Sequence, residues 1–205
     1  RLTQMGAQLP TLETPESPQF VFAHFVAPHP PFVLGKQDRL WQQSHAFAFR
    51  DGSEYRYHYK ISSHAYIVRY REQLDVLNEM ILEAIQGILS HSGRPSVIIV
   101  QSDHGPGAYL DWQDPKRTVM KERMSILNAY YIPNDEDIGL YEGISPVNTF
   151  RLILNRYFNT SLPLLEDESY FSTMSRPYDF IRVTEAIEAE DWGRKSHAFR
   201  NLTYE

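Results

Sequence analysis

Apolar residues recur along the chain in two patterns, and each pattern predicts a different kind of element. Between Ser62 and Ser90 they are three or four positions apart, which is one face of a long amphipathic helix. This face consists of Tyr66, Tyr70, Leu74, Leu77, Ile81, Ile85 and Ile88. Gly93 and Pro95 follow, and we expect them to end the helix.

Two continuous apolar runs predict buried strands. The run FVFAHFVA, from Phe20 to Ala27, leads into the loop PHPPF, where three prolines prevent a regular continuation. The run SVIIVQ follows the long helix and stops at Ser102, before Asp103, His104 and Gly105. A fully apolar strand after a helix is typical of a parallel sheet covered by helices on both faces.

The remaining periodic segments extend this pattern. SILNAYYIP, residues 125–133, is a third candidate strand. SPVNTFRLILNRYF, residues 145–158, predicts a second helix with Ser145 as its cap and Pro146 at its first position. The order is strand, helix, strand, strand, helix. We therefore predict an α/β fold in which a mostly parallel sheet is sandwiched between helices.

Composition suggests where this domain begins and ends. Residues 1–17 are polar and rich in Pro and Thr, which predicts a linker or leading segment. The predicted α/β domain covers residues 18–184, and residues 185–205 are expected to form a peripheral tail. Residues 37–59 show no clear period and predict an irregular excursion. For the aromatic residues within 55–59 we favour core or interface packing over contact with sugars or lipids.

Charge and residue usage narrow the possible partners. The chain has 205 residues, 42% of them hydrophobic, which is enough for a substantial core. Its net charge of −6 comes from interspersed acids and bases, so we expect no nucleic-acid partner.

The absence of cysteine excludes disulfides and thiolate metal ligands. No apolar run approaches the roughly 20 residues that span a bilayer, so the chain as given is expected to be soluble.

Asp103 and His104 are the strongest candidates for chemistry. Ligands of open α/β sheets bind beyond the carboxyl ends of the strands, and this pair follows such an end. A carboxylate beside an imidazole suits zinc, manganese or a similar divalent ion. Gly105 and Gly107 would let the backbone turn closely past the ion. The alternative is structural, with Asp103 capping a loop and no metal bound.

Two further histidines lie in or just after the first apolar run. His29 lies in the proline-rich loop, where its imidazole could contact an anionic group of a substrate. His24 lies inside the predicted strand, so it is either a second substrate-binding residue or a hydrogen-bonded core histidine.

Taken together, these motifs resemble the sulfatase/alkaline-phosphatase superfamily over about Pro18 to Phe158. The resemblance rests on FVFAHFVAPHPPF, the long helix, VIIVQSDHG, a strand ending in YYIP and a helix beginning SPVNTF. It implies a metal-dependent hydrolase or transferase acting on phosphate or sulfate esters. Asp103 and His104 would bind zinc, manganese, magnesium or calcium, and His29 would contact the phosphate or sulfate group of the substrate.

The likeness is closest to the membrane-anchored, lipoteichoic-acid-synthase-like branch, in which transmembrane helices precede an extracytoplasmic catalytic domain. Members carry a Ser, Thr or formylglycine nucleophile in the amino-terminal half of the domain, and we identify none here. The nearest approach to a formylglycine motif, STMSR at residues 172–176, has Met174 where Pro belongs. We therefore expect the chain to be the carboxyl-terminal part of such a domain and inactive alone. The alternative is a non-catalytic module that binds an anionic glycan, a lipid headgroup or a protein partner.

Overall fold

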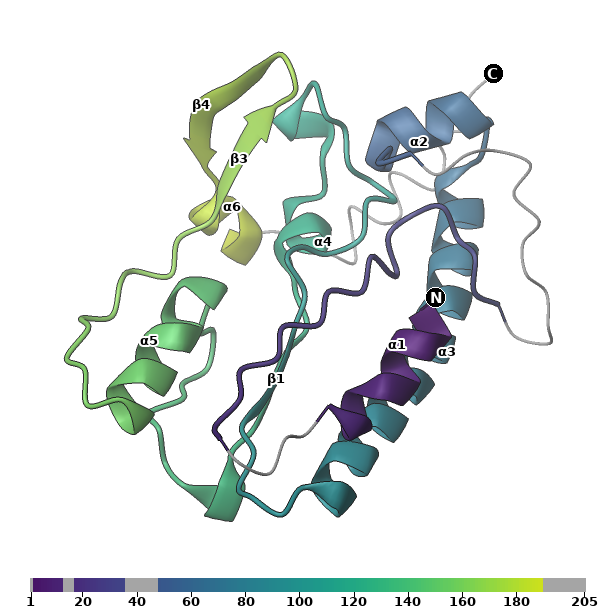
Figure 1. The fold of residues 1–205 in the computed structure, drawn as a ribbon. Helices are drawn as coiled ribbons and strands as arrows, with labels where there is room; N and C mark the ends of the chain where they lie inside the picture. Colours follow the sequence, from purple (N-terminus) through teal and green to yellow (C-terminus); the bar gives the residue numbers. More distant parts are fainter. Residues whose placement is uncertain (1, 13–16, 36–47, 190–205) are drawn as a thin grey trace. The chain divides into compact units, whose positions relative to one another are not determined.

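The computed structural model describes residues 2–12, 17–35 and 48–189 (Figure 1). The chain divides into two compact units, one ending at Ser96 and the other beginning at Val97. Each unit is described separately below.

The first unit is built around one long helix. Its elements are α1 (Leu2–Gln8), the 3-10 helix η1 (Leu9–Thr11), α2 (Gly52–Tyr59) and α3 (Ser63–His91). The prediction of a helix between Ser62 and Ser90 is confirmed, and every residue of its predicted apolar face is buried or half-buried. The Ser62 hydroxyl accepts a hydrogen bond from the Ala65 backbone N–H, which caps the first turn.

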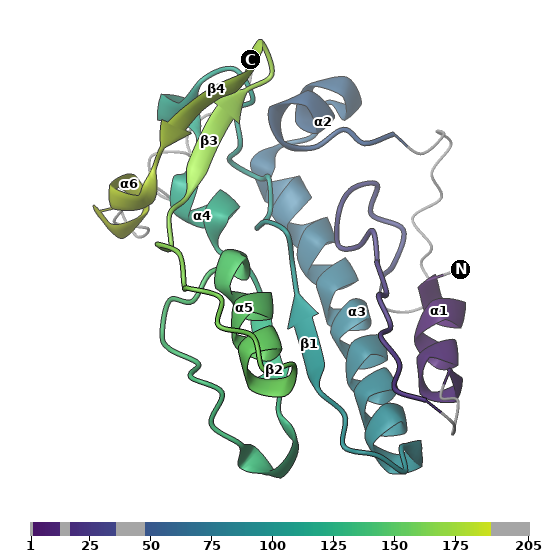
Figure 2. The ribbon, with the colours of Figure 1, turned by 60° about the vertical axis from the view of Figure 1, so that its left-hand side comes forward.

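Helix α1 and η1 lie along α3, as Figures 1 and 2 both show. The approach is close at Gly87, where a Cβ atom would lie 2.5 Å from Cγ of Pro10. Only glycine leaves room for the ring of Pro10 at this point. Most of the described part of the predicted leading segment, residues 1–17, is therefore helical and packed on α3.

An aromatic cluster forms the core of the first unit. Phe32 is 1% exposed, and its ring makes edge-on contacts with Tyr55, Tyr66 and Tyr70, with centroids 5.0–6.4 Å apart. The packing interpretation is thus confirmed for Tyr55, whereas Tyr57 is exposed. The expectation of irregular structure was wrong for residues 52–59, which form α2; residues 37–47 lie outside the described residues.

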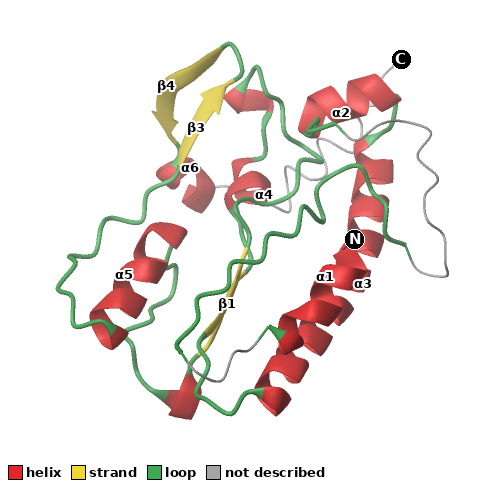
Figure 3. Cartoon of the chain, viewed as in Figure 1, coloured by secondary structure: helices red, strands yellow, loops and turns green. Residues whose placement is uncertain are grey.

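The second unit combines short strands with short helices (Figure 3). In chain order its elements are β1 (Ile98–Gln101), η2 (Pro115–Arg117), α4 (Met120–Met124), β2 (Asn128–Tyr131), η3 (Pro133–Asp135), α5 (Pro146–Tyr157), β3 (Tyr170–Thr173), β4 (Arg176–Arg182) and α6 (Thr184–Ala189).

The prediction of a mostly parallel, alkaline-phosphatase-like sheet was wrong. In the described residues the strands form two sheets of two strands each, β1 with β2 and β3 with β4, and both pairs are antiparallel. Ile98 faces Tyr131 across the first pair, and Gln101 faces Asn128. Strand β1 is half-buried or exposed along its length, not covered on both faces. An apolar run indicates partial burial, but it does not determine which strand pairs with it or in which direction.

The run FVFAHFVA also differs from its prediction. Residues 20–27 form no strand, and Phe20, Val21 and Phe22 are at least half exposed. His24 is exposed as well, so the interpretation of it as a core histidine was wrong. The proline loop that follows is placed by side-chain contacts rather than by a sheet, as described below.

Two apolar clusters stabilise the second unit. One joins Leu110, Met120, Phe171 and Val183, and Ile187 of α6 packs against it. Residues 184–189 of the predicted tail therefore contact the core, and the rest of that tail lies outside the described residues.

The other cluster joins Ile138 to Leu152 and Ile153 of α5, and Ile99 of β1 packs against it. Helix α5 begins at Pro146 as predicted. Ser145 precedes it, but its side chain makes no capping hydrogen bond.

Candidate functional site

Asp103 and His104 lie directly after the paired strands. The ladder between β1 and β2 continues for one step, because the Ser102 N–H donates to the Leu127 carbonyl at 3.0 Å. The Leu127 N–H in turn donates to the Ser102 hydroxyl at 2.9 Å. The chain is thus fixed up to the residue that precedes the candidate site. This pairing places the two side chains on a rigid support.

The two side chains converge on each other. His104 Nε2 lies 3.5 Å from Oδ2 of Asp103, and the other carboxylate oxygen accepts the His104 backbone N–H at 3.1 Å. The Asp103 side chain is 83% exposed and that of His104 is 32% exposed, so both are open to a ligand from solvent.

Hydrogen bonding determines which ring nitrogen of His104 carries a proton. Nδ1 lies 2.8 Å from the carbonyl oxygen of Gly105. A carbonyl can only accept, so Nδ1 must donate. In the neutral ring Nε2 then presents a lone pair towards a carboxylate oxygen, and two such groups attract only if a cation or a proton lies between them. This arrangement suits a proton or a cation that bridges Nε2 and the carboxylate.

Gly105 has no room for a side chain. A Cβ atom there would collide with the carbonyl oxygens of Glu122 and Ser125, the latter only 2.5 Å away. The Gly105 N–H donates to the Arg123 carbonyl at 2.7 Å, which draws the two segments together. Glycine is required here by the close approach of α4, and this explains its place after the Asp-His pair.

Helix α4 supports the turn through two buried charged residues that the sequence did not reveal. Arg123 is 7% exposed, and its Nη1 donates to the Gly105 carbonyl at 3.1 Å. Glu122 is equally buried and accepts the Tyr109 backbone N–H at 2.9 Å. In the sequence these two residues are only an adjacent Glu and Arg in a short, mostly polar segment. Such a pair is typical of an exposed surface and gives no sign of burial.

His29 is arranged in a similar way within the first unit. Its Nδ1 donates to the Pro30 carbonyl, which leaves Nε2 available to another partner. The half-buried ring lies edge-on to Phe49, with centroids 6.4 Å apart. His24 has a different setting: it is exposed, with its ring 6.2 Å from that of Phe22.

Gln73 of α3 holds the loop that carries His29. Its side chain is fully buried, and its carbonyl oxygen accepts the backbone N–H groups of Val33 and Leu34 at 2.7 and 3.0 Å. Its amide nitrogen donates to the His29 carbonyl at 3.3 Å. This residue was not predicted from the sequence. The prolines indicate that a loop is present, but nothing in the sequence indicates that a glutamine 40 residues after Val33 bonds to that loop.

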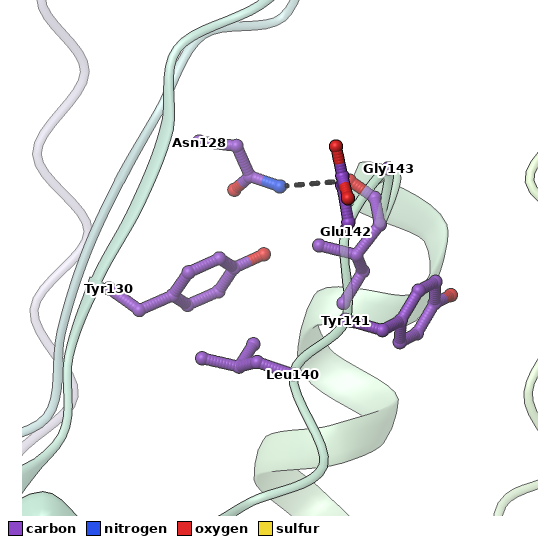
Figure 4. Close-up of a pocket in the computed structure, with 7 residues that line it drawn as sticks. Asn128, Tyr130, Leu140, Tyr141, Glu142 and Gly143 are labelled. Carbon is purple, nitrogen blue, oxygen red and sulfur yellow. Dashed lines mark hydrogen bonds between the residues drawn. The ribbon is translucent and has the colours of Figure 1, made fainter.

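A pocket of about 380 Å³ in the second unit is lined on one side by Asn128 and Tyr130 of β2 (Figure 4). Residues 140–144 form its other side. The Asn128 amide donates to the Ile144 carbonyl at 3.2 Å, and the Tyr130 hydroxyl is 2.7 Å from that of Thr149. The first bond joins the two sides of the pocket and the second joins Tyr130 to α5, so these polar groups have structural partners and we assign the pocket no catalytic role.

Asp167 anchors the polar network beside this pocket. Its carboxylate accepts hydrogen bonds from the Tyr141 hydroxyl at 2.6 Å and from the Ser145 backbone N–H at 2.7 Å. Burial raises the pKa of Asp167, but hydrogen bonds from Ser145, Tyr141 and Asn148 outweigh it and hold this pKa below its usual value. The same bond to Asp167 raises the pKa of the Tyr141 phenol.

Asn148 is fully buried and links this network to the chain after α5. Its amide nitrogen donates to the Leu165 carbonyl at 2.8 Å, and its amide oxygen accepts the Leu165 N–H at 2.9 Å. Both backbone groups of Leu165 are thereby satisfied. Asn148 therefore positions the segment before β3, which is a structural role.

Asp103 and His104 are of the residue types that bind divalent ions. An exposed carboxylate and an imidazole in its Nδ1–H form are ligands that zinc and manganese accept. Within the described ranges, no group of three or more His, Asp and Glu side chains converges on one point. The described part of the chain therefore offers this pair of ligands and not a complete set.

The chain was compared with known proteins in three ways, and no family model, curated protein or solved structure matches it. Among the helices in the described residues, none is both long and apolar enough to cross a membrane.

Proposed function

We propose that this chain supplies two metal ligands, Asp103 and His104, to an enzyme that hydrolyses or transfers phosphate or sulfate esters. The observation that carries the proposal is the 2.8 Å contact between Nδ1 of His104 and the Gly105 carbonyl. A carbonyl only accepts, so this contact assigns the proton to Nδ1 and leaves Nε2, 3.5 Å from Oδ2 of Asp103, as the ligating nitrogen. Ligating histidines commonly donate their second nitrogen to a backbone carbonyl in this way.

A bound zinc, manganese, magnesium or calcium ion would supply Lewis-acid stabilisation of the charge that develops on the ester oxygens. The residues of this chain would perform simpler tasks. Asp103 would supply a negative oxygen ligand from its exposed side chain. His104 would supply a neutral nitrogen held in one orientation by Gly105.

His29 is proposed to bind the anionic group of the substrate. With Nδ1 donating to Pro30, Nε2 can donate to a phosphate or sulfate oxygen when the ring is protonated, or accept a proton when it is neutral. Gln73 keeps the loop in place while it does so. His24 is exposed two residues from a large aromatic ring and is proposed only as an additional contact to the substrate.

We propose that the nucleophile lies outside these 205 residues and that the isolated chain is inactive. The parent would belong to the sulfatase-like, lipoteichoic-acid-synthase-like branch that the motifs resemble, with its catalytic domain outside the cytoplasm and anchored to the membrane by segments upstream of this chain.

A second candidate is a non-catalytic module that binds an anionic glycan, a lipid headgroup or a protein partner. This candidate is favoured because, within the described residues, no third His, Asp or Glu side chain joins Asp103 and His104. In that function the Asp103–His104 pair would be an ion pair between carboxylate and imidazolium, with no metal.

Elemental analysis of the purified chain after equilibration with excess divalent metal distinguishes the two candidates. We expect near-stoichiometric zinc or manganese in the wild type and its loss in Asp103→Ala/His104→Ala. A His91→Ala/Asp114→Ala control removes an exposed histidine and a partly exposed aspartate elsewhere and should retain the metal. Equal metal content in all three proteins would refute the metal site.

Turnover of an aryl phosphate or aryl sulfate is the companion assay. We expect none from the isolated chain with any of the four metals. Turnover that disappears in Asp103→Ala/His104→Ala would show that the nucleophile is within the 205 residues.

A further inference from the structure

The carbonyl of Gly105 is the meeting point of two donors. It accepts Nδ1–H of His104 at 2.8 Å and Nη1–H of Arg123 at 3.1 Å. The N–H of the same glycine donates to the Arg123 carbonyl at 2.7 Å. Arg123 therefore contacts Gly105 at both of its backbone polar groups.

These contacts matter because glycine has more backbone freedom than any other residue. The direction of the Gly105 carbonyl depends on that freedom, and the ring orientation of His104 depends on that carbonyl. One hydrogen bond donated by the Arg123 guanidinium and one accepted by the Arg123 carbonyl restrict both ends of the residue.

Arg123 is itself held firmly. Its guanidinium carbon lies 5.3 Å from the centre of the Trp112 ring, within the range of a cation–π contact. Its backbone N–H donates to the Val119 carbonyl at 3.2 Å at the start of α4. The side chain is 7% exposed, so few other positions are open to it.

We propose that Arg123 is a positioning residue that fixes the tautomer and orientation of His104 through the Gly105 carbonyl. This deepens the proposed function and relies on it for the identity of the ligand that His104 binds. Without the Arg123 guanidinium, only the backbone bond from the Gly105 N–H to residue 123 remains. The Gly105 carbonyl can then turn away from Nδ1, and the proton can move to Nε2, the nitrogen that would bind metal.

The test combines His104 tautomer and metal affinity. Long-range ¹H–¹⁵N correlation spectra of ¹⁵N-histidine-labelled protein report the tautomer, with the His104 signal assigned by its absence in His104→Ala. Titration calorimetry with Zn²⁺ or Mn²⁺ reports affinity. The variants are Arg123→Met, Arg123→Lys and, as a control, Arg117→Gln. Arg117 is an exposed cation of the same segment that pairs with Asp111 and Asp114.

The wild type and Arg117→Gln should show only the Nδ1–H tautomer. Arg123→Met should show a population with the proton on Nε2 and about 10- to 100-fold weaker metal affinity, as expected for loss of an outer-shell partner. The tautomer population and metal affinity of Arg123→Lys should lie between those of the wild type and Arg123→Met, because an ammonium keeps the charge but not the planar geometry of the guanidinium.

An unchanged tautomer and affinity in a folded Arg123→Met overturns the proposal. If Arg123→Met loses its native circular dichroism, Arg123→Lys carries the test, and wild-type affinity in that variant overturns the proposal. A wild type that binds no metal but whose His104 tautomer depends on Arg123 supports the positioning role while refuting the proposed function. If the wild type binds metal and a folded Arg123→Met binds it equally well, the positioning role is overturned and the proposed metal site stands.

Discussion

Gly105 shows most clearly how one residue determines the candidate site. The turn after His104 passes so close to the backbone of α4 that no Cβ atom fits. The same closeness allows the reciprocal hydrogen bonds with Arg123. A glycine that seemed in the sequence to serve only a tight turn is thus also the contact that orients a candidate metal ligand.

We predict that Gly105→Ala destabilises the protein by about 3 kcal/mol, at the upper end of the cost of overpacking. Gly93→Ala is the matched control, because a Cβ atom there meets nothing within 4 Å. Its effect on the free energy of unfolding should be within about 0.5 kcal/mol of zero. Urea denaturation followed by circular dichroism measures both. Equal stabilities of the two variants would contradict the close approach at Gly105.

Asp167 gives a prediction about pH. Its pKa is lowered in the folded state, so the unfolded chain binds the proton first as pH falls below about 4. The stability that Asp167 contributes is therefore present above the pKa of the unfolded state and is lost as pH falls through the folded-state pKa. Asp167→Asn should be less stable than wild type by about 1 kcal/mol at pH 7.

The difference in free energy of unfolding between wild type and Asp167→Asn should shrink between about pH 4 and pH 2, the range below the usual carboxyl pKa. Tyr141→Phe removes one of the hydrogen bonds that lower this pKa and should reduce the same difference in part. A difference that stays constant with pH would contradict the role assigned to the Asp167 carboxylate.

At the scale of elements, buried polar side chains on helices hold segments that have no regular secondary structure. Gln73 of α3 satisfies three backbone groups of the loop from His29 to Leu34. Asn148 of α5 does the same for both backbone groups of Leu165. In each case a side chain of a helix satisfies backbone groups that no strand pairing satisfies in the described residues.

We predict that Gln73→Leu lowers the free energy of unfolding by about 3 kcal/mol, because it leaves buried backbone groups without partners. It should also accelerate hydrogen exchange of the Val33 and Leu34 amides. Gln86→Leu changes an exposed glutamine of the same helix and should cost about 0.5 kcal/mol or less. Equal exchange rates at Val33 and Leu34 in wild type and Gln73→Leu would show that the loop is held in another way.

The sequence predicted some of these elements well because their signal is local. The apolar face of α3 repeats over many turns, and Pro146 has a strong preference for the first turn of a helix, so both helices were located within a residue or two. The polar partners of loops were not predicted. Gln73 and Asn148 act on residues far along the chain, and a single buried amide has no periodic signal.

At the scale of the whole molecule, the prediction of a mostly parallel sheet was wrong. Apolar runs indicated strands, but in the described residues β1 pairs with β2 in the antiparallel direction and residues 20–27 form no strand. Pairing depends on contacts between distant segments, which hydrophobicity alone does not encode. The prediction of Asp103 and His104 as site residues does not depend on the sheet, because they follow a strand end whichever way that strand is paired.

The most direct test of the account is the location of a metal ion by anomalous diffraction from crystals of the chain grown with Mn²⁺ or Zn²⁺. We predict an anomalous peak about 2.0–2.2 Å from both Nε2 of His104 and a carboxylate oxygen of Asp103, with Nδ1 of His104 still donating to Gly105. A peak elsewhere, or a map without a peak in which Nε2 of His104 donates directly to Asp103, would contradict the account. In the second case the pair would be a structural ion pair.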